Sequence, residues 1–282
     1  MTPTTRLHDH GTWRLLSPVA LDAAPLLGRL QAVLESVGAG LAPATVCFER
    51  WASPALILGT GQPAADADLA ACRARGITIV RRLAGGTAVY ASPDYLSFAI
   101  VAPTAHPLLG TDLMATYRRL GAAVVAACRA LDVPARLIAP DEARARPTPP
   151  LLRPCCYGGV SPYEVLVGDR KLVGVAQVRR LGAVAYVGGL YRTFAPSEQS
   201  GCLAGDAALR LERATRLAAC TIDLAALGRP QALDQFPPAL VAALAERCVI
   251  TLSPGALTGA ERERAAQLRA ARYDRDEWTS RQ

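Results

Sequence analysis

Alternating hydrophobic and polar positions divide the chain into short strands and longer helices. Apolar residues recur at helical spacing in three segments of the first half: 21–37, 66–75 and 112–131. Strand patterns occupy four segments of the same half: 44–49, 55–59, 77–82 and the stretch from the glycine turn at 83–87 through 101. The first half of the chain is therefore predicted to mix strands with helices.

The second half begins with a proline-rich segment and continues with three strands. Residues 139–155 hold five prolines in a charged stretch, which predicts a loop. Strand-like alternation then covers 163–167, 171–177 and 183–190, and Gly168–Asp169 suits a tight hairpin turn. Because neighbouring strands are joined by hairpins, the pattern favours an α+β fold with a mixed sheet over a doubly wound fold.

The pattern changes again near residue 206. From there on the chain is mainly helical, and it ends in an amphipathic tail over 259–281. We therefore expect a strand-containing domain over 1–205 and a mainly helical part over 206–282 that packs on the same domain.

Composition fits a folded protein without membrane segments. With 282 residues, of which 51% are hydrophobic and 20% charged, the chain can bury a substantial core. No apolar run reaches the length of about eighteen residues that a membrane-spanning helix needs, so no membrane partner is expected. Residues 1–13 carry Arg6, His8 and Asp9 and lack the apolar stretch of a secretory signal, which predicts a cytoplasmic protein.

Cysteine and charge patterns exclude several classes of protein. Eight cysteines are scattered without a C-x-x-C pair, and the three histidines form no cluster with them. Neither a disulfide framework nor a metal site is therefore expected. The net charge of +7 favours acidic protein partners. Nucleic acid is not expected as a partner, because only 5% of residues are aromatic and no nucleic-acid-binding motif occurs.

One basic residue stands out from the rest. Of the 31 basic residues, only Lys171 is a lysine. A GC-rich genome replaces lysine by arginine wherever either will do, so a retained lysine indicates a need for its compact, titratable ammonium group. Lys171 lies in G-D-R-K-L-V-G-V-A-Q, where glycine permits close approach of a ligand, although an ordinary surface hairpin is the alternative. Candidate ligand contacts beside it are Val173, Gly174 and Ala176.

A second candidate site is the glycine turn that follows the strand over 77–82. Paired glycines let a backbone approach a ligand closely, and exposed N–H groups favour an anionic or carbonyl oxygen. The candidate substrate-binding residues here are Arg81, Arg82, Gly85, Gly86, Thr87, Ala88, Val89 and Tyr90. The segment matches neither the Rossmann nor the P-loop pattern, and an ordinary tight turn is the alternative.

A third candidate is the Cys155–Cys156 pair, which is followed by a tyrosine and two glycines. A thiolate is a strong nucleophile toward thioesters when a cation lies beside it. Cys156 precedes Lys171 by fifteen residues, and two hairpin-related segments could bring them together. The alternative is a buried, inert thiol.

The order of these segments resembles that of the lipoate–protein ligase and octanoyltransferase family. R-R-L-A-G-G-T-A-V-Y at 81–90 is similar to the R-R-x-[ST]-G-G-x-A-V-x string of the family. Y-E-V-L-V-G-D-R-K-L-V-G-V-A-Q at 163–177 resembles its strand pair, and R-Y-D-R-D-E-W at 272–278 is similar to its usual ending. The resemblance implies an α+β fold shared with biotin–protein ligases, with a mixed, largely antiparallel sheet flanked by helices and a catalytic domain over 1–205.

The resemblance implies two alternative chemistries, both acting on lipoyl domains or a glycine-cleavage H protein. Transferases carry an octanoyl or lipoyl group from acyl carrier protein, or from an acylated donor protein, on a cysteine and require no cofactor. Ligases activate lipoate or octanoate with ATP and Mg²⁺ through an acyl-adenylate. Cys156 lies seven residues before Tyr163, where the octanoyltransferase branch has its nucleophile. The transferase is therefore expected, with Cys156 and Lys171 as catalytic residues, Lys171 lowering the pKa of the thiol and later assisting proton transfer.

The chain departs from the family at several pocket positions. Ala91 and Ser92 replace a frequent His-Asp, and Val187 stands where a histidine often precedes glycine. Ala84 and Thr87 replace other usual residues of the glycine turn. Because of these losses, a non-catalytic module that binds lipoyl domains is kept as a third alternative.

Overall fold

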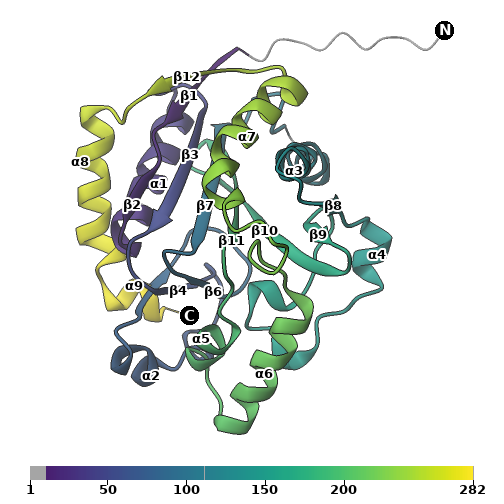
Figure 1. Cartoon of the computed structure of the whole chain (residues 1–282). Helices are drawn as coiled ribbons and strands as arrows, with labels where there is room; N and C mark the ends of the chain where they lie inside the picture. Colours follow the sequence, from purple (N-terminus) through teal and green to yellow (C-terminus); the bar gives the residue numbers. More distant parts are fainter. Residues whose placement is uncertain (1–10, 111, 282) are drawn as a thin grey trace, which may run out of the picture.

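The computed structural model describes residues 11–110 and 112–281, so residues 1–10, where the sequence predicts no secretory signal, lie outside the described part. Two sheets form the framework (Figure 1). The larger sheet has the spatial order β12 (Thr251–Gly255), β1 (Thr12–Leu16), β3 (Thr45–Trp51), β7 (Tyr95–Pro103), β11 (Ala183–Tyr191), β10 (Arg170–Arg180), β9 (Val165–Val167) and β8 (Arg136–Leu137), with β2 (Val19–Leu21) beside β3. The smaller sheet has the order β5 (Thr78–Arg81), β4 (Ala55–Leu58) and β6 (Val89–Ala91).

The larger sheet is mixed and mostly antiparallel. The pairs from β3 through β7, β11, β10 and β9 to β8 are all antiparallel. β1 runs parallel to both β3 and β12, and β2 runs parallel to β3. The predicted α+β class with a mixed, largely antiparallel sheet is therefore confirmed.

Helices cover both faces of the larger sheet (Figure 1). α1 (Ala23–Gly38) lies against one face, and α8 (Gly259–Leu268) packs on α1. α3 (Leu113–Arg129) and α7 (Ala232–Cys248) pack together on the opposite face. A hydrophobic core therefore lies on each face of the sheet. Alternating side chains of β7 contribute to both cores, because Phe98 and Ile100 face α3 and α7 whereas Val101 faces α1.

Shorter helices surround the smaller sheet and the loops. They are α2 (Leu69–Ala74), α4 (Pro140–Arg144), α5 (Pro196–Gly201), α6 (Ala207–Cys220) and α9 (Asp276–Ser280). Single helical turns occur at η1 (Ala64–Asp66), η2 (Pro150–Leu152), η3 (Cys156–Gly158) and η4 (Arg269–Tyr273). The helix predicted over 66–75 is shorter in the structure, where α2 covers Leu69–Ala74. It begins later because the Asp68 side chain accepts from the N–H of Ala71 and caps the helix there.

The structure corrects one further expectation about the elements. The segment 139–155 is not a continuous loop, since Pro140 and Pro150 each occupy the first turn of a short helix. The part after residue 206 is mainly helical, as predicted, and the short strand β12 within it completes the edge of the larger sheet beside β1.

The last third of the chain is tied to the first third by buried polar contacts. Arg14 of β1 donates to both carboxylate oxygens of Glu261 in α8, at 2.6 and 2.7 Å. Near the C-terminus, the indole N–H of Trp278 donates to the carbonyl of Arg81 at 2.8 Å. Among the described helices, none combines the length and the hydropathy needed to cross a membrane.

Candidate active site

Lys171 enters the site from the start of β10. The hairpin between β9 and β10 turns at Gly168, whose φ of +57° favours glycine. The ladder between the two strands then shifts register between Lys171 and Val173, and such a bulge re-aims a side chain. The carbonyl of Lys171 accepts from the N–H of Ile222 at 2.9 Å. The Lys171 side chain is thereby directed inward, with only 3% of it exposed.

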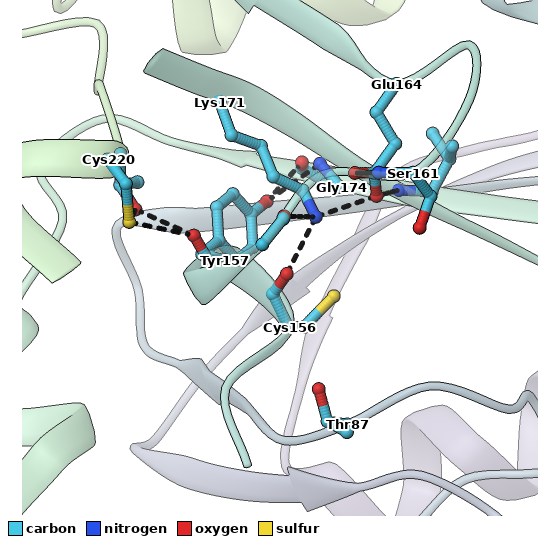
Figure 2. A network of polar contacts seen from close by, with 12 residues as sticks. Thr87, Cys156, Tyr157, Ser161, Glu164, Lys171, Gly174 and Cys220 are labelled. Atoms are coloured by element: carbon cyan, nitrogen blue, oxygen red, sulfur yellow. Dashed lines mark hydrogen bonds and ion pairs between the residues drawn. The ribbon is translucent and has the colours of Figure 1, made fainter. Parts of the chain in front are cut away.

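The Lys171 ammonium group contacts three acceptors (Figure 2). Its Nζ lies 2.7 Å from Oε1 of Glu164, 2.7 Å from the carbonyl oxygen of Cys156 and 3.1 Å from that of Gly159. The other carboxylate oxygen of Glu164 accepts from the backbone N–H of Ser161 at 2.8 Å. Since an ammonium group has three N–H donors, all of them have partners in this arrangement.

Electrostatics keep Lys171 charged. Burial alone would lower the pKa of its ammonium group, but the Glu164 carboxylate and then the Cys156 thiolate outweigh burial, so the pKa is raised. Attraction between the ammonium group and a negatively charged sulfur at Cys156 is part of this balance. Lys171 is therefore suited to stabilise negative charge beside it, not to accept a proton.

Cys156 is the first residue of the single turn η3, and both its backbone N–H and its carbonyl form hydrogen bonds. Its N–H donates to the carbonyl of Ala88 at 2.9 Å, and its carbonyl accepts from Lys171. Two glycines follow it closely, and a side chain at Gly159 would collide with Thr148, so the segment can pack this tightly only with glycine there. The Cys156 side chain is half-buried, and Figure 2 shows it between Lys171 and Thr87.

The neighbouring thiol is in a different environment. Cys155 is 2% exposed, and burial raises its pKa to about 12. A thiol that stays protonated at neutral pH is a poor nucleophile. Of the two adjacent thiols, Cys156 is the more accessible one.

The glycine turn between β5 and β6 is braced by Arg82. Its guanidinium donates to the carbonyls of Ile57, Gly85 and Thr87 at 2.8 to 3.1 Å. Gly86 has a φ of +83°, a conformation that glycine adopts without strain. Across the described residues, the N–H groups of Gly85, Gly86 and Thr87 have no hydrogen-bond acceptor. They are available to a ligand oxygen.

An apolar cavity and a polar chamber meet at Cys156. The cavity, of about 110 Å³, lies between α1 and the larger sheet. Its apolar walls include Leu27, Leu30, Leu34, Trp51, Ile57, Leu83, Ala84, Val89, Tyr95, Phe98, Val175, Ala176, Val178, Ala185, Val187 and Tyr273. The chamber is lined by Gly85, Gly86, Thr87, Thr148, Arg153, Ser161, Glu164 and Lys171. Cys156, Arg82, Val175 and Ala176 line both spaces, and an apolar cavity of this kind suits an alkyl chain.

The structure brings most of the predicted site residues together. Those that line the cavity or the chamber are Cys156, Lys171, Arg82, Gly85, Gly86, Thr87, Val89, Gly174 and Ala176. Gly174 leaves room for the Lys171 side chain and the Tyr157 ring, each 3.4 Å from where a Cβ would stand.

Four predicted substrate contacts lie elsewhere. The fully buried Arg81 donates to the carbonyls of Gly59, just after β4, and Thr279 in α9. It thereby holds the C-terminal helix α9 against the smaller sheet. Ala88, Tyr90 and Val173 are buried in the hydrophobic cores, although the Ala88 carbonyl holds the backbone of Cys156. These four residues therefore maintain the shape of the site and do not line the cavity or the chamber.

Two carboxylates of the site were missed at the level of sequence. Glu164 stands in the quoted Y-E-V-L-V string, seven residues before Lys171, but the string does not reveal that the two side chains pair. Glu49 lies in β3, next to Arg50, and lines the cavity. Successive residues of a strand point to opposite faces, so one of these two adjacent charges had to face the α1 side of the sheet, and that is the signal that could have identified Glu49.

Comparison with known proteins shows which family has this fold and this sequence pattern. Residues 24–245 match the family model described as the lipoyl protein ligase A/B catalytic domain. The chain belongs to the lipoyl protein ligase A/B catalytic domain family. Within it, the chain is similar to octanoyltransferase LipM of Symbiobacterium thermophilum, at 32% identity over 95% of this chain and 98% of that protein. It is also 32% identical to octanoyltransferase LipM of Kyrpidia tusciae, over 96% and 99% of the two chains.

Solved structures show the same fold in other members of the family. The bi-partite lipoate protein ligase of Thermoplasma acidophilum, solved in a study of that ligase and its E2 lipoyl domain, matches with a TM-score of 0.78. That match has 23% identity and covers 97% of each chain. A lipoate-protein ligase A bound with ATP matches with a TM-score of 0.75 at 22% identity, over 96% of this chain and 98% of that one. The predicted family and the predicted class of enzyme, an acyltransferase of the octanoyltransferase kind, are confirmed.

Proposed function

We propose that this enzyme transfers an octanoyl or lipoyl group through a thioester on Cys156 to a lysine of a lipoyl domain or a glycine-cleavage H protein. The observation that carries the proposal is the position of Cys156, which lines both the apolar cavity and the polar chamber. An acyl chain in the cavity would place its carbonyl at the thiol, while the chamber leaves the carbonyl open to a second substrate.

In the first step, the Cys156 sulfur attacks the acyl carbonyl of the donor, which is a thioester on acyl carrier protein or a lysine amide on an acylated protein. A new sulfur–carbon bond forms, the donor thiol or lysine amine leaves, and the proton of Cys156 ends on that leaving sulfur or nitrogen. The N–H groups of Gly85, Gly86 and Thr87, which line the chamber and have no acceptor among the described residues, would bind the developing oxyanion. One such donor contributes roughly 3–4 kcal/mol to catalysis in well-studied enzymes.

In the second step, the neutral amine of the acceptor lysine attacks the Cys156 thioester. The nitrogen–carbon bond forms, the sulfur–carbon bond breaks, and the amine proton passes to the Cys156 sulfur, which restores the thiol. Lys171 remains an ammonium group through both steps because its pKa is raised. Its role is to hold the Cys156 carbonyl and to stabilise negative charge on the sulfur.

The alternative with ATP and Mg²⁺ requires cations that can take up phosphates. Lys171 already donates to Glu164 and two carbonyls, and Arg82 donates to three carbonyls of the chain. We favour a thioester as the source of activation, and a reaction that requires no cofactor, because Cys156 lines both the apolar cavity and the polar chamber.

The partners follow from the same proposal. Acyl carrier proteins and lipoyl domains are expected to be acidic, and the net charge of +7 would speed their encounter with this enzyme. We further propose that residues 206–282 belong to the same domain as 1–205, because β12 extends the larger sheet and α8 packs on α1.

A transfer assay tests the proposal. The purified enzyme is mixed with an octanoylated acyl carrier protein and an unmodified lipoyl domain, with and without ATP and Mg²⁺. We expect octanoylation of the lipoyl domain without ATP, lost in Cys156→Ser. Transfer from free octanoate that requires ATP and survives Cys156→Ser would identify a ligase, and tight binding without transfer would identify a non-catalytic module.

A further inference from the structure

The acyl cavity contains one carboxylate that the proposed chemistry does not use. Glu49 lines the cavity and is only 4% exposed. Its Oε2 is 3.5 Å from the Ser97 hydroxyl, which in turn accepts from the indole N–H of Trp51 at 3.1 Å. Within the described residues, its Oε1 is buried and has no hydrogen-bond partner. A buried polar atom without a partner is uncommon and calls for a functional explanation.

Strand register places Glu49 across the cavity from the reacting end. Glu49 pairs with Ser97, Ser97 with Gly189, and Gly189 with Gly174. Gly174 is the position that contacts the Lys171 side chain. With neighbouring strands about 4.8 Å apart, three separations put Glu49 about 14 Å from Gly174, a span comparable to an extended octanoyl chain on sulfur.

We propose that Glu49 forms a polar end wall of the acyl cavity and thereby limits the length of the acyl chain that the enzyme transfers. The inference rests on the proposed function, since it assumes an acyl chain on Cys156. A chain that stops short of Glu49 leaves the carboxyl group accessible to water. A longer chain presses methylene groups against Oε1 and removes its remaining hydrogen-bonding possibilities, which disfavours that chain on the order of tenfold.

Ionisation of Glu49 gives the wall a pH dependence. Burial raises the pKa of Glu49 to about 7, against smaller lowering effects of Arg29 in α1 and the Ser97 hydroxyl. The other neighbours are the Cys47 thiol of the same strand and the neutral indole of Trp51. Below pH 7 the carboxyl group is neutral, and above it a carboxylate must be buried against the chain, which costs more. Discrimination against long chains therefore becomes stricter as the pH rises through about 7.

Competition between two chain lengths tests the inference. The enzyme is incubated with equal amounts of octanoyl- and decanoyl-pantetheine thioesters at pH 6 and pH 8, and intact mass spectrometry gives the ratio of the two Cys156 adducts. Because both chains react with the same thiol, ionisation of Cys156 cancels from this ratio. For the unaltered enzyme we expect a decanoyl-to-octanoyl ratio well below one that falls severalfold further at pH 8.

Two substitutions separate polarity from steric bulk. Glu49→Leu keeps similar bulk but is apolar, so the ratio should rise about tenfold and lose its pH dependence. Glu49→Gln keeps a polar wall that cannot ionise, so the ratio should match the unaltered enzyme at pH 6 and stay there at pH 8. This variant decides the question even if leucine at a buried site impairs folding. Glu212→Gln, at an exposed carboxylate of α6, is the matched control.

The outcomes separate this inference from the function on which it rests. Adducts whose ratio is the same in Glu49→Gln, Glu49→Leu and the unaltered enzyme at both pH values overturn the polar wall alone. Absence of any adduct on the unaltered enzyme overturns the proposed function, and the wall with it.

Discussion

Lys171 has the environment of a residue that was kept for its chemistry. It is the only lysine of the chain, its side chain is 3% exposed, and it pairs with Glu164, whose side chain is equally buried. Breaking a buried pair by removing one partner is costly, whereas pairs at a surface contribute little. The inference from composition alone, that a lone lysine among arginines has a function, agrees with this geometry.

Arginine at position 171 should impair the reaction although it keeps the charge. The guanidinium is longer and planar, so it cannot place donors on Glu164, Cys156 and Gly159 within the same enclosed volume. We expect Lys171→Arg to slow acylation of Cys156 at least about 100-fold, measured by rapid-quench mass spectrometry. Arg170→Lys, at the exposed neighbouring position of β10, should leave the rate within about twofold. Full activity of Lys171→Arg would contradict a catalytic role for Lys171.

At the scale of the element, the glycine turn between β5 and β6 shows what sequence could and could not predict. The paired glycines correctly indicated a tight turn, because only glycine adopts a φ of +83° without strain. The arginine roles could not be separated by sequence. Arg82 hydrogen-bonds to the carbonyls of the turn from within the site. Arg81 points to the opposite face of the strand and binds the carbonyl of Thr279 near the C-terminus.

Alanine at position 86 should distort the turn and its free N–H groups. The left-handed conformation costs a residue with a Cβ about 1–3 kcal/mol, and the new Cβ would stand 3.2 Å from the Arg82 guanidinium. We expect Gly86→Ala to lower the unfolding free energy by that amount in urea and to slow acylation at least about tenfold. Gly61→Ala, at a nearby glycine with open space and no positive φ, is the control. Equal effects of the two substitutions would argue against the turn as an oxyanion site.

Strands with a clear alternating pattern were predicted well, whereas β12 was not predicted. The strands around Lys171 and the turn at Gly168 follow from two-residue alternation bounded by turn residues. β12 reads T-L-S-P-G, without alternation, and its pairing with β1 joins segments more than 200 residues apart. Local patterns carry no information on such a contact. For the same reason, the acceptors of Lys171 could not be predicted, since two of them are backbone carbonyls.

At the scale of the whole molecule, the C-terminal part completes the structure around the cavity. Glu261 of α8 forms a buried, two-point ion pair with Arg14 of β1, and Tyr273 reaches the cavity wall. The hydroxyl of Tyr273 donates to Gln31 of α1 at 2.7 Å. The helical part beyond residue 206 therefore takes part in shaping the site from the α1 side.

Loss of the buried ion pair should destabilise the whole fold. Glu261→Ala leaves the guanidinium of Arg14 buried without its carboxylate, which should lower the unfolding free energy by about 3–5 kcal/mol. Arg264→Ala removes a more exposed pair of the same helix with Glu35 and should cost less than about 1 kcal/mol. Urea unfolding followed by circular dichroism gives both values. Two equally small losses would mean that α8 does not stabilise the domain.

The central claim is that Cys156 carries the acyl group. Intact mass spectrometry of the enzyme after incubation with octanoyl-acyl carrier protein, without ATP, tests it most directly. The account predicts one octanoyl adduct that hydroxylamine removes, that is absent in Cys156→Ser and that persists in Cys155→Ser. An unmodified enzyme that octanoylates a lipoyl domain only when ATP and free octanoate are supplied would contradict it.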